Sequence, residues 1–390
     1  MKILIFSTAY LPFVGGAELA IKEITDRLPD ISFTLITARF SRGVPARERI
    51  GNVEVYRVGF GTRFDKWFLP WLGLRKAKQL ESTAHFDVLW SMMASQASLS
   101  ATWFKELHQG KKLVLTLQEG DEEAHLKRYV LGNEFLYELF IRSWHVAVFK
   151  QANVITAISN YLADRARRNS SAEVEVIPNG VTVGKFQIPN SKSQTNSKSQ
   201  NTEVRQRLGI KPEDKVVITT SRLVEKNGVG DLIEAMQYLP EYVKLLICGT
   251  GHLDRDYKLK AKSYQLEGRI RFLGHVPNEQ LPDYLQSADI FCRPSLSEGL
   301  GISFLEAMAA GVPVVATPVG GIPDFLSDGG TGLFCEVNNP KSIAEKVQTL
   351  LSDSDLRTRI ATNALAMVQE KYGWEGIAEK MKSVFVDKVD

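Results

Sequence analysis

Residues 298–312 read EGLGISFLEAMAAGV, and they carry the strongest structural signal in the chain. An apolar run from Ile290 to Pro294 precedes this stretch, and a second apolar run from Val312 to Thr317 follows it. The pattern predicts strand, glycine-containing loop, helix and strand. The N–H groups of such a loop and of a helix N-terminus suit an anion such as a diphosphate. Glu298 in the loop and Glu306 in the helix would frame that anion and contact different parts of one ligand.

The spacing of the two glutamates, with GLG after the first and AMAAGVPVV after the second, closely resembles a known family. That family is the retaining glycosyltransferases of the GT-B fold, the group 1 or GT4 class. The likeness extends over almost the whole chain, through SRLVEK at 221–226, GTG at 249–251, GHVP at 274–277 and GGIPD at 320–324. Any one of these motifs is a weak signal, whereas five in series are strong. The resemblance implies two Rossmann-like domains facing a cleft, with a C-terminal helix that returns to the N-terminal domain.

Length and composition fit a two-domain globular protein. A chain of 390 residues is too long for one ordinary core. Forty-eight basic against 45 acidic residues, a net charge of +3, give no broad electrostatic reason to bind nucleic acid. The three cysteines are far apart and mostly within apolar runs, which predicts buried thiols and not disulfides or a metal site. The chain shows no signal peptide and no run of about 18 apolar residues, so we expect a cytoplasmic protein.

Apolar runs alternate with amphipathic segments in both halves of the chain, which predicts a mostly parallel sheet wrapped by helices in each half. We therefore expect an α/β protein with an acceptor domain at 1–180, a nucleotide-sugar donor domain at 181–372 and a returning helix at 373–390. The polar segment 190–203, which contains a tandem NSKSQ repeat, predicts a disordered surface loop. The predicted strands are 3–6, 33–37, 88–91, 113–117, 154–157, 216–220, 244–248, 270–273, 290–293 and 314–317.

Two cations follow the strand predicted at 216–220, where open α/β sheets place their ligand-binding loops. Arg222 and Lys226 are four positions apart, so both side chains can reach the same phosphates. The arginine would bind with two parallel N–H groups and the lysine with a single compact charge. Sugar transfer from a nucleotide donor requires that the charge of the departing diphosphate be neutralised. A pair of solvated surface charges is the alternative. The resemblance implies the diphosphate role, and it assigns catalytic parts to Glu298, Arg222 and Lys226.

The resemblance also implies which residues bind the rest of the donor. Glu306 matches the carboxylate that binds the ribose hydroxyls, and a carboxylate can accept from two adjacent hydroxyls. Backbone groups near Val276 match those that contact the base. A glycine pair after the first strand matches the family's glycine loop, although two glycines alone are equally typical of a simple turn. The donor-binding residues implied in this way are Gly15, Gly16, Val276, Gly299, Leu300, Gly301, Ile302 and Glu306.

One departure from the family concerns the acceptor side. Where the family commonly has a histidine after the strand at 113–117, this chain has Gln118, which cannot act as a base but can hydrogen-bond a sugar hydroxyl. Glu119 and Asp121 follow, and they either take over part of that role or cap and solvate the loop. Retaining transfer in this family is thought to use the leaving phosphate as the base. No cluster of histidines or acids has metal-ligand spacing, so we expect neither a metal nor a cofactor.

The segment 57–78 combines an excess of basic residues with interleaved aromatic residues. This combination suits the headgroup region of a lipid bilayer. One interpretation is reversible contact with the inner face of the cell membrane, since related enzymes often act on lipid-linked acceptors. The other is an acceptor-site wall or an ordinary half-buried helix.

The resemblance predicts a retaining, metal-independent glycosyltransferase of polysaccharide biosynthesis. It would move a hexose or N-acetylhexosamine from a nucleoside-diphosphate sugar to a hydroxyl of a glycan or lipid-linked glycan. Gln118 motivates a second reading, a nucleotide-sugar-binding protein with little transfer activity. A sugar-nucleotide epimerase or a glycogen-type synthase on the same fold is a third. A dinucleotide oxidoreductase is disfavoured because no GxGxxG fingerprint leads from a strand into a helix.

Overall fold

The computed structural model describes residues 1–13, 15–118, 133, 143–187 and 203–387. Two compact units are present: unit 1 comprises Met1–Asn179 and Trp374–Asp390, and unit 2 comprises Gly180–Gly373. The chain therefore enters unit 2 after Asn179 and leaves it after Gly373. Residues 190–202 of the segment predicted to be a disordered loop lie outside the described residues, and residue 203 is helical.

Unit 1 contains an eight-stranded sheet in the order β3-β4-β2-β1-β5-β6-β7-β8. All neighbouring strands are parallel except β3 and β4, which are antiparallel. The strands predicted in this half are confirmed, whereas β3, β4 and β8 were not predicted. The strands are β1 (Lys2–Phe6), β2 (Ser32–Ala38), β3 (Arg47–Ile50), β4 (Val53–Val58), β5 (Val88–Met92), β6 (Lys112–Leu117), β7 (Val154–Ala157) and β8 (Glu173–Val176).

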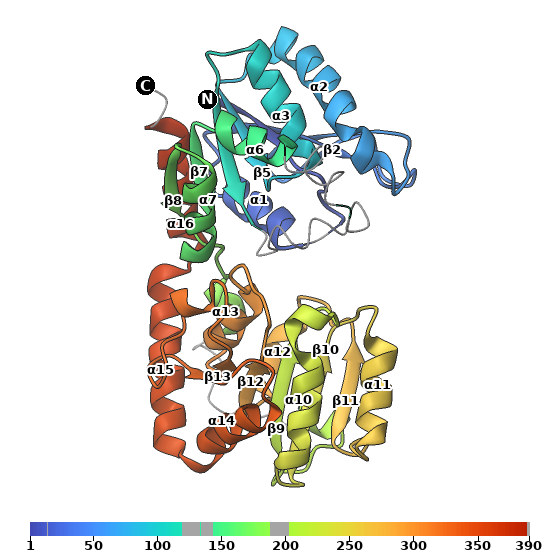
Figure 1. Ribbon diagram of the computed structural model, residues 1–390, viewed down its shortest axis with the longest axis vertical. Coiled ribbons are helices and arrows are strands. Elements are labelled where there is room, and N and C mark those ends of the chain that lie inside the picture. Colours follow the sequence, from blue (N-terminus) through green and yellow to red (C-terminus); the bar gives the residue numbers. More distant parts are fainter. Residues whose placement is uncertain (14, 119–132, 134–142, 188–202, 388–390) are drawn as a thin grey trace. The chain divides into compact units, whose positions relative to one another are not determined.

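Alternation along the buried strands divides the core of unit 1 into two layers. In β1, Ile3 and Ile5 belong to one apolar cluster and Leu4 and Phe6 to the other, because successive side chains point to opposite faces of the sheet. Helices cover both faces (Figure 1). The helices on the first face are α1 (Gly16–Asp26) and α16 (Trp374–Val386), and those on the second face are α2 (Asp65–Ala84) and α3 (Gln96–Leu107). Unit 1 also contains α6 (Ser143–Gln151) and α7 (Asn160–Asn169).

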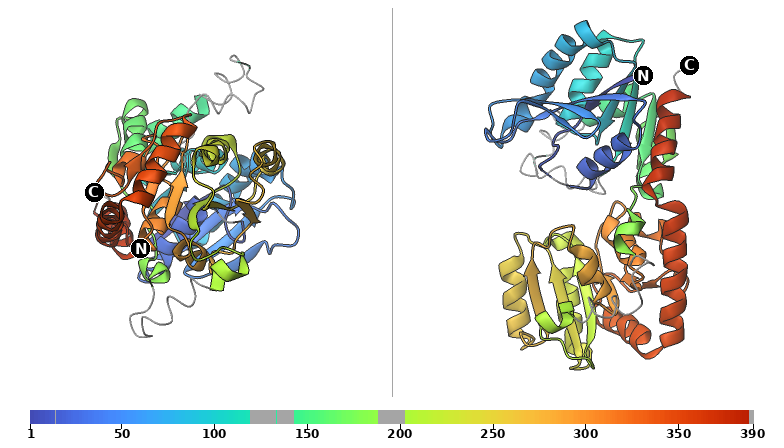
Figure 2. Two further views of the ribbon diagram at one scale, coloured as in Figure 1. Left: turned by 90° about the horizontal axis from the view of Figure 1, so that it is seen from below. Right: turned by 180° about the vertical axis from the view of Figure 1, so that it is seen from behind.

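The returning C-terminal helix α16 is part of unit 1, as the resemblance implied (Figure 2, red). Its Phe385 ring packs on Trp90 of β5 at 5.1 Å between ring centroids. The buried Lys112 of β6 donates a hydrogen bond from Nζ to the carbonyl oxygen of Val384 at 2.8 Å. Apolar packing and a buried cation on a helix carbonyl together anchor α16 to the sheet.

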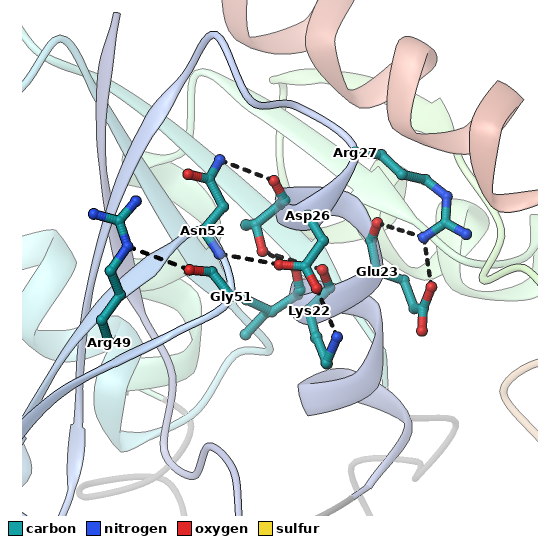
Figure 3. Close-up of polar contacts among 9 residues, drawn as sticks. Lys22, Glu23, Asp26, Arg27, Arg49, Gly51 and Asn52 are labelled. Carbon is teal, nitrogen blue, oxygen red and sulfur yellow. Dashed lines mark hydrogen bonds and ion pairs between the residues drawn. The ribbon is translucent and has the colours of Figure 1, made fainter. Parts of the chain in front are cut away.

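A polar cluster fixes the C-terminal end of α1, the helix that follows the glycine loop (Figure 3). Asp26 accepts from Lys22 Nζ at 2.6 Å and from the backbone N–H of Asn52 at 3.0 Å. The Asn52 amide also donates to the carbonyl oxygens of Thr25, Leu28 and Ile31 at 3.0–3.1 Å. These carbonyls lie at and beyond the helix end, where Thr25 and Leu28 each accept one backbone N–H at 3.2 Å, so the β3–β4 turn adds a further donor that caps α1.

Asn52→Ala should therefore destabilise unit 1. It removes the donor to several half-buried carbonyls, and we expect a loss of about 1–3 kcal/mol in the free energy of unfolding. Urea denaturation followed by circular dichroism measures it. Gln237→Ala is the matched control, because the Gln237 amide donates only one exposed bond, to the carbonyl of Glu234. Equal stability of the two variants would contradict the capping role.

Unit 2 contains a six-stranded parallel sheet in the order β11-β10-β9-β12-β13-β14. The strands predicted in this half are confirmed, and helices flank the sheet on both sides (Figures 1 and 2). The strands are β9 (Lys215–Thr220), β10 (Val243–Cys248), β11 (Ile270–Gly274), β12 (Ile290–Arg293), β13 (Val314–Ala316) and β14 (Leu333–Phe334). The helices include α8 (Val183–Phe186), α10 (Val229–Ala235), α11 (Asp254–Ser263), α12 (Leu281–Gln286), α13 (Ile302–Ala309), α14 (Pro340–Ser352) and α15 (Ser354–Lys371).

The three cysteines of the chain lie in unit 2. Cys248, Cys292 and Cys335 are buried as free thiols, which confirms the prediction from their sequence context. Burial raises the pKa of the Cys248 and Cys335 thiols to about 12, so they are protonated and unreactive at neutral pH.

Candidate active site

The candidate site lies where the connections of the unit 2 sheet change direction. From β9 the chain moves to β10 and β11 on one side, whereas β12 lies next to β9 and leads to β13 and β14 on the other. Open α/β sheets bind ligands at the carboxyl ends of the strands at such a switch point. The loops after β9 and β12 therefore meet at the position where a ligand is expected.

The loop after β9 carries both predicted cations. Arg222 is exposed, and Lys226 is half-buried in a short 3₁₀ turn (Glu225–Asn227). The Asn227 amide donates to the carbonyl oxygen of Arg222 at 2.7 Å, which closes the loop on itself. The carbonyl oxygen of Lys226 accepts from the backbone N–H of Leu296 at 2.7 Å. This last bond ties the cation-bearing loop to the loop after β12.

The loop after β12 leads into α13 through Gly301. Gly301 has φ +88° and begins the helix without a side chain to cap it. The Phe304 N–H donates to the Gly301 carbonyl oxygen at 3.0 Å, and the N–H groups of Ile302 and Ser303 at the start of the helix have no capping side chain. A Cβ at Gly301 would lie 2.5 Å from the Phe304 ring. Gly320, in the loop after β13, approaches even closer, since a Cβ there would lie 1.8 Å from the carbonyl oxygen of Glu298. The loop is thus closely packed, with N–H groups at a helix N-terminus.

Glu298 is held by its own loop. One carboxylate oxygen accepts from the guanidinium of Arg293, and the other accepts from the backbone N–H of Gly299 at 3.0 Å. Arg293 is the last residue of β12 and is buried. Because both oxygens are engaged, the carboxylate is suited to orient a neighbouring group and not to attack one.

Glu306 lies in the second turn of α13 and is half-buried. Burial raises the pKa of its carboxyl group to about 7, while the positive charges of Lys185 and Arg293 oppose that rise. Among the described residues, no group donates a hydrogen bond to this carboxylate. A half-buried acid without a donor is placed to accept hydrogen bonds from a ligand.

The unit 1 residues predicted for the site surround the first strand and β6. Gly15 precedes α1, and a Cβ there would lie 2.6 Å from a carboxylate oxygen of the buried Glu18. Gln118 and Asn179 exchange two amide hydrogen bonds, of 3.0 and 2.6 Å. Gln118 therefore binds the residue at which the chain leaves unit 1. Glu119 and Asp121 lie outside the described residues.

Comparison with known proteins assigns the chain to a family. A family model described as "Glycosyl transferases group 1" matches residues 200–367, and one described as "Glycosyltransferase Family 4" matches residues 14–185. An uncharacterised glycosyltransferase of Methanocaldococcus jannaschii is 34% identical over 99% of this chain and 98% of its own length. The chain belongs to the group 1 glycosyltransferases.

Other proteins that are similar to this glycosyltransferase have names that indicate different products. N-acetyl-alpha-D-glucosaminyl L-malate synthase of Bacillus anthracis is 25% identical over 99% of this chain and 97% of its own length. Sucrose-phosphate synthase of Thermosynechococcus elongatus aligns with a TM-score of 0.81 at 20% identity, covering 99% of this chain and 98% of the other. Anabaena HepE in complex with UDP-glucose aligns with a TM-score of 0.78 at 21% identity, covering 99% and 100%. The structural matches confirm the predicted GT-B fold.

The structure brings most predicted donor residues of the transferase to one edge of the unit 2 sheet. Arg222, Lys226, Glu298 and the backbone of residues 299–301 lie in the two adjoining loops, and Ile302 begins α13. Val276 lies in the loop after β11 at the same edge. Gly15 and Gly16 belong to unit 1.

Two charged residues beside the acids were missed from the sequence. The positive charge of Lys185 in α8 opposes the rise that burial causes in the pKa of the Glu306 carboxyl group. The two residues are 121 positions apart in the chain, and no local sequence pattern relates them. Arg293 acts on Glu298 from the end of β12. A signal for Arg293 was present, since it is the one charged residue in the run IFCRP, and an arginine within an apolar strand needs a buried partner.

Proposed function

We propose that this transferase is a retaining, metal-independent enzyme that moves a hexose or N-acetylhexosamine from a nucleoside-diphosphate sugar to a hydroxyl of a glycan or lipid-linked glycan. One observation carries the proposal: the loop with the two cations Arg222 and Lys226, a helix N-terminus and two carboxylates lie at the switch point of a parallel sheet. Such a set can bind a diphosphate, a sugar and a ribose at once. The match to HepE bound to UDP-glucose, and to a GDP-mannose-dependent mannosyltransferase of Corynebacterium glutamicum at 31% identity over 60% of this chain, supports this donor class.

In this mechanism the bond between the sugar C1 and the diphosphate oxygen breaks as the acceptor oxygen forms a new bond on the same face. Arg222 and Lys226 neutralise the charge that accumulates on the leaving diphosphate, so a bound metal is not required for that step. The diphosphate oxygen takes the proton of the acceptor hydroxyl. Glu298 orients the sugar, and Glu306 accepts hydrogen bonds from the ribose hydroxyls.

A donor panel tests the proposal. UDP-, GDP- and ADP-sugars are titrated by calorimetry in the presence of EDTA against the wild type and Glu306→Ala. We expect one donor to bind selectively and to bind more weakly to the variant. Transfer to an acceptor with retention at the anomeric carbon, followed by NMR, would exclude a binding protein without activity. Conversion of the donor with no acceptor present would indicate the epimerase instead, and absence of binding to all donors would contradict the proposal.

We further propose that unit 1 contacts a lipid surface through α2. The aromatic side chains at the start of this helix line one face and are 42–61% exposed, while Leu69, Gly73 and Ala77 bury the opposite face. Exposed basic residues flank them, which favours anionic headgroups. Arg57, counted with this basic segment from the sequence, is instead buried in β4 and paired with Glu48. The aromatic face comprises Phe60, Phe64, Trp67, Phe68 and Trp71, and the flanking cations are Arg63, Arg75 and Lys78.

Replacing Trp67 and Trp71 by serine should reduce co-sedimentation of the protein with anionic phospholipid vesicles by about tenfold, since two large apolar side chains would leave the interface. Tyr238→Ser with Tyr242→Ser is the matched control, because these aromatic residues are equally exposed but belong to unit 2. Unchanged sedimentation of the tryptophan variant would disprove the contact. Within the described ranges, no helix combines the length and apolar character needed to cross a bilayer.

A further inference from the structure

Arg293 joins three parts of the candidate donor site. Its guanidinium donates to Ser295 Oγ at 3.1 Å in the loop, to Ser303 Oγ at 2.7 Å in the first turn of α13, and to the carboxylate of Glu298. It also lies 4.2 Å from the centroid of the Phe304 ring. The side chain is buried, and so its orientation is fixed from four directions. The end of β12, the loop and the start of α13 are therefore held together by one cation.

The charge of Arg293 also matters for the neighbouring anion site. Glu298 lies in the loop that would surround the diphosphate, and an unopposed carboxylate there would repel it. Arg222 is close enough for its positive charge to act on Arg293, which shows that the two guanidinium groups and Glu298 share one electrostatic environment. The ion pair between Arg293 and Glu298 therefore offsets the negative charge of that carboxylate beside the proposed diphosphate site.

We propose that Arg293 is a positioning residue of the donor site: it fixes the Glu298 carboxylate and cancels its charge, so that the loop before α13 accepts a diphosphate. This inference rests on the proposed function, because it takes that loop as the diphosphate site. Arg293 itself is covered by its loop and acts through Glu298 and Ser303, not by contact with the reacting atoms.

Titration of UDP, GDP and ADP without a sugar tests the inference, since the sugar contacts of Glu298 then play no part. The proteins are the wild type, Arg293→Gln, Glu298→Gln and the double variant. We expect Arg293→Gln to weaken binding of the nucleotide that the wild type selects by at least about tenfold, because Glu298 is left unpaired beside the phosphates. Glu298→Gln should bind that nucleotide at least as tightly as the wild type. The affinity of the double variant for that nucleotide should return to within about threefold of the wild type, because the second substitution removes the carboxylate that the first one leaves unpaired.

The matched control is Arg269→Gln. Arg269 is also a partly buried arginine of unit 2, but it donates to the carbonyl oxygens of Leu239, Pro240 and Val243, at the opposite edge of the sheet. Its replacement should lower the unfolding midpoint and leave nucleotide affinity unchanged. A purely structural role for Arg293 would give the same result as this control.

Three results would overturn the inference: wild-type affinity in Arg293→Gln, a double variant no better than Arg293→Gln, or clearly weaker binding by Glu298→Gln. If Arg293→Gln does not fold, Glu298→Gln and the double variant still test the inference, because it requires both of them to retain their affinity for the nucleotide. Absence of binding by the wild type to all three nucleotides is a different result, since it would remove the proposed function and this inference with it.

Discussion

Arg222→Ala and Lys226→Ala should each lower the rate of sugar transfer by roughly 100- to 1000-fold, the effect of removing one fixed group that stabilises charge in a transition state. Both residues lie in the loop after β9, and the bond from Leu296 to the Lys226 carbonyl holds that loop beside Glu298. The loss should fall mainly on kcat, because the charge on the diphosphate grows as the bond to the sugar breaks.

Steady-state kinetics with the selected donor and a saturating acceptor measure this loss. Arg222→Lys should recover part of the rate, since a point charge replaces the fork. Arg255→Ala is the control, because Arg255 is an exposed arginine of α11 in the same unit. A transfer rate within about threefold of the wild type in both alanine variants would show that the phosphates bind elsewhere.

Glu306→Gln should weaken donor binding by about 10- to 100-fold and yet stabilise the protein at pH 8. The carboxylate is placed to accept from two ribose hydroxyls, and an amide offers only one oxygen. The folded carboxyl group has a pKa of about 7, against an ordinary value of 4.5. Between these two values the folded protein binds more protons than the unfolded chain, so the free energy of unfolding falls as pH rises through this window.

Above pH 7 the wild type carries the full cost of the half-buried charge, on the order of 1–3 kcal/mol, and glutamine removes it. Urea denaturation at pH 5 and pH 8 should therefore show a gap between variant and wild type only at pH 8. The donor affinity of the wild type should rise from pH 6 to pH 8, whereas that of the variant should stay flat. Glu279→Gln, which changes an exposed acid, should show neither effect. A variant less stable than the wild type at pH 8 would refute the pKa shift.

The buried strands were predictable because their apolar runs are continuous, as in β1, β5 and β9. The strands β4 and β8 were missed because they largely alternate polar and apolar residues, and β3 was missed because three of its four residues (RERI) are charged; both patterns are equally typical of a loop. At the site, the motif residues were located from their order along the chain. Arg293 and Lys185 were not, because their importance arises from folding, which buries one charge and brings the other to a distant acid.

The burial of all three cysteines has a practical consequence for measuring how the enzyme moves. Because the native thiols are inaccessible, a maleimide dye should react only with a cysteine that is introduced at the surface. Leu107 at the end of α3 and Leu259 in α11 are suitable positions, one in each unit, and they are 56% and 55% exposed. Energy transfer between dyes on Leu107→Cys and Leu259→Cys would report whether a nucleotide sugar changes the distance between the two labelled positions in an otherwise unaltered chain.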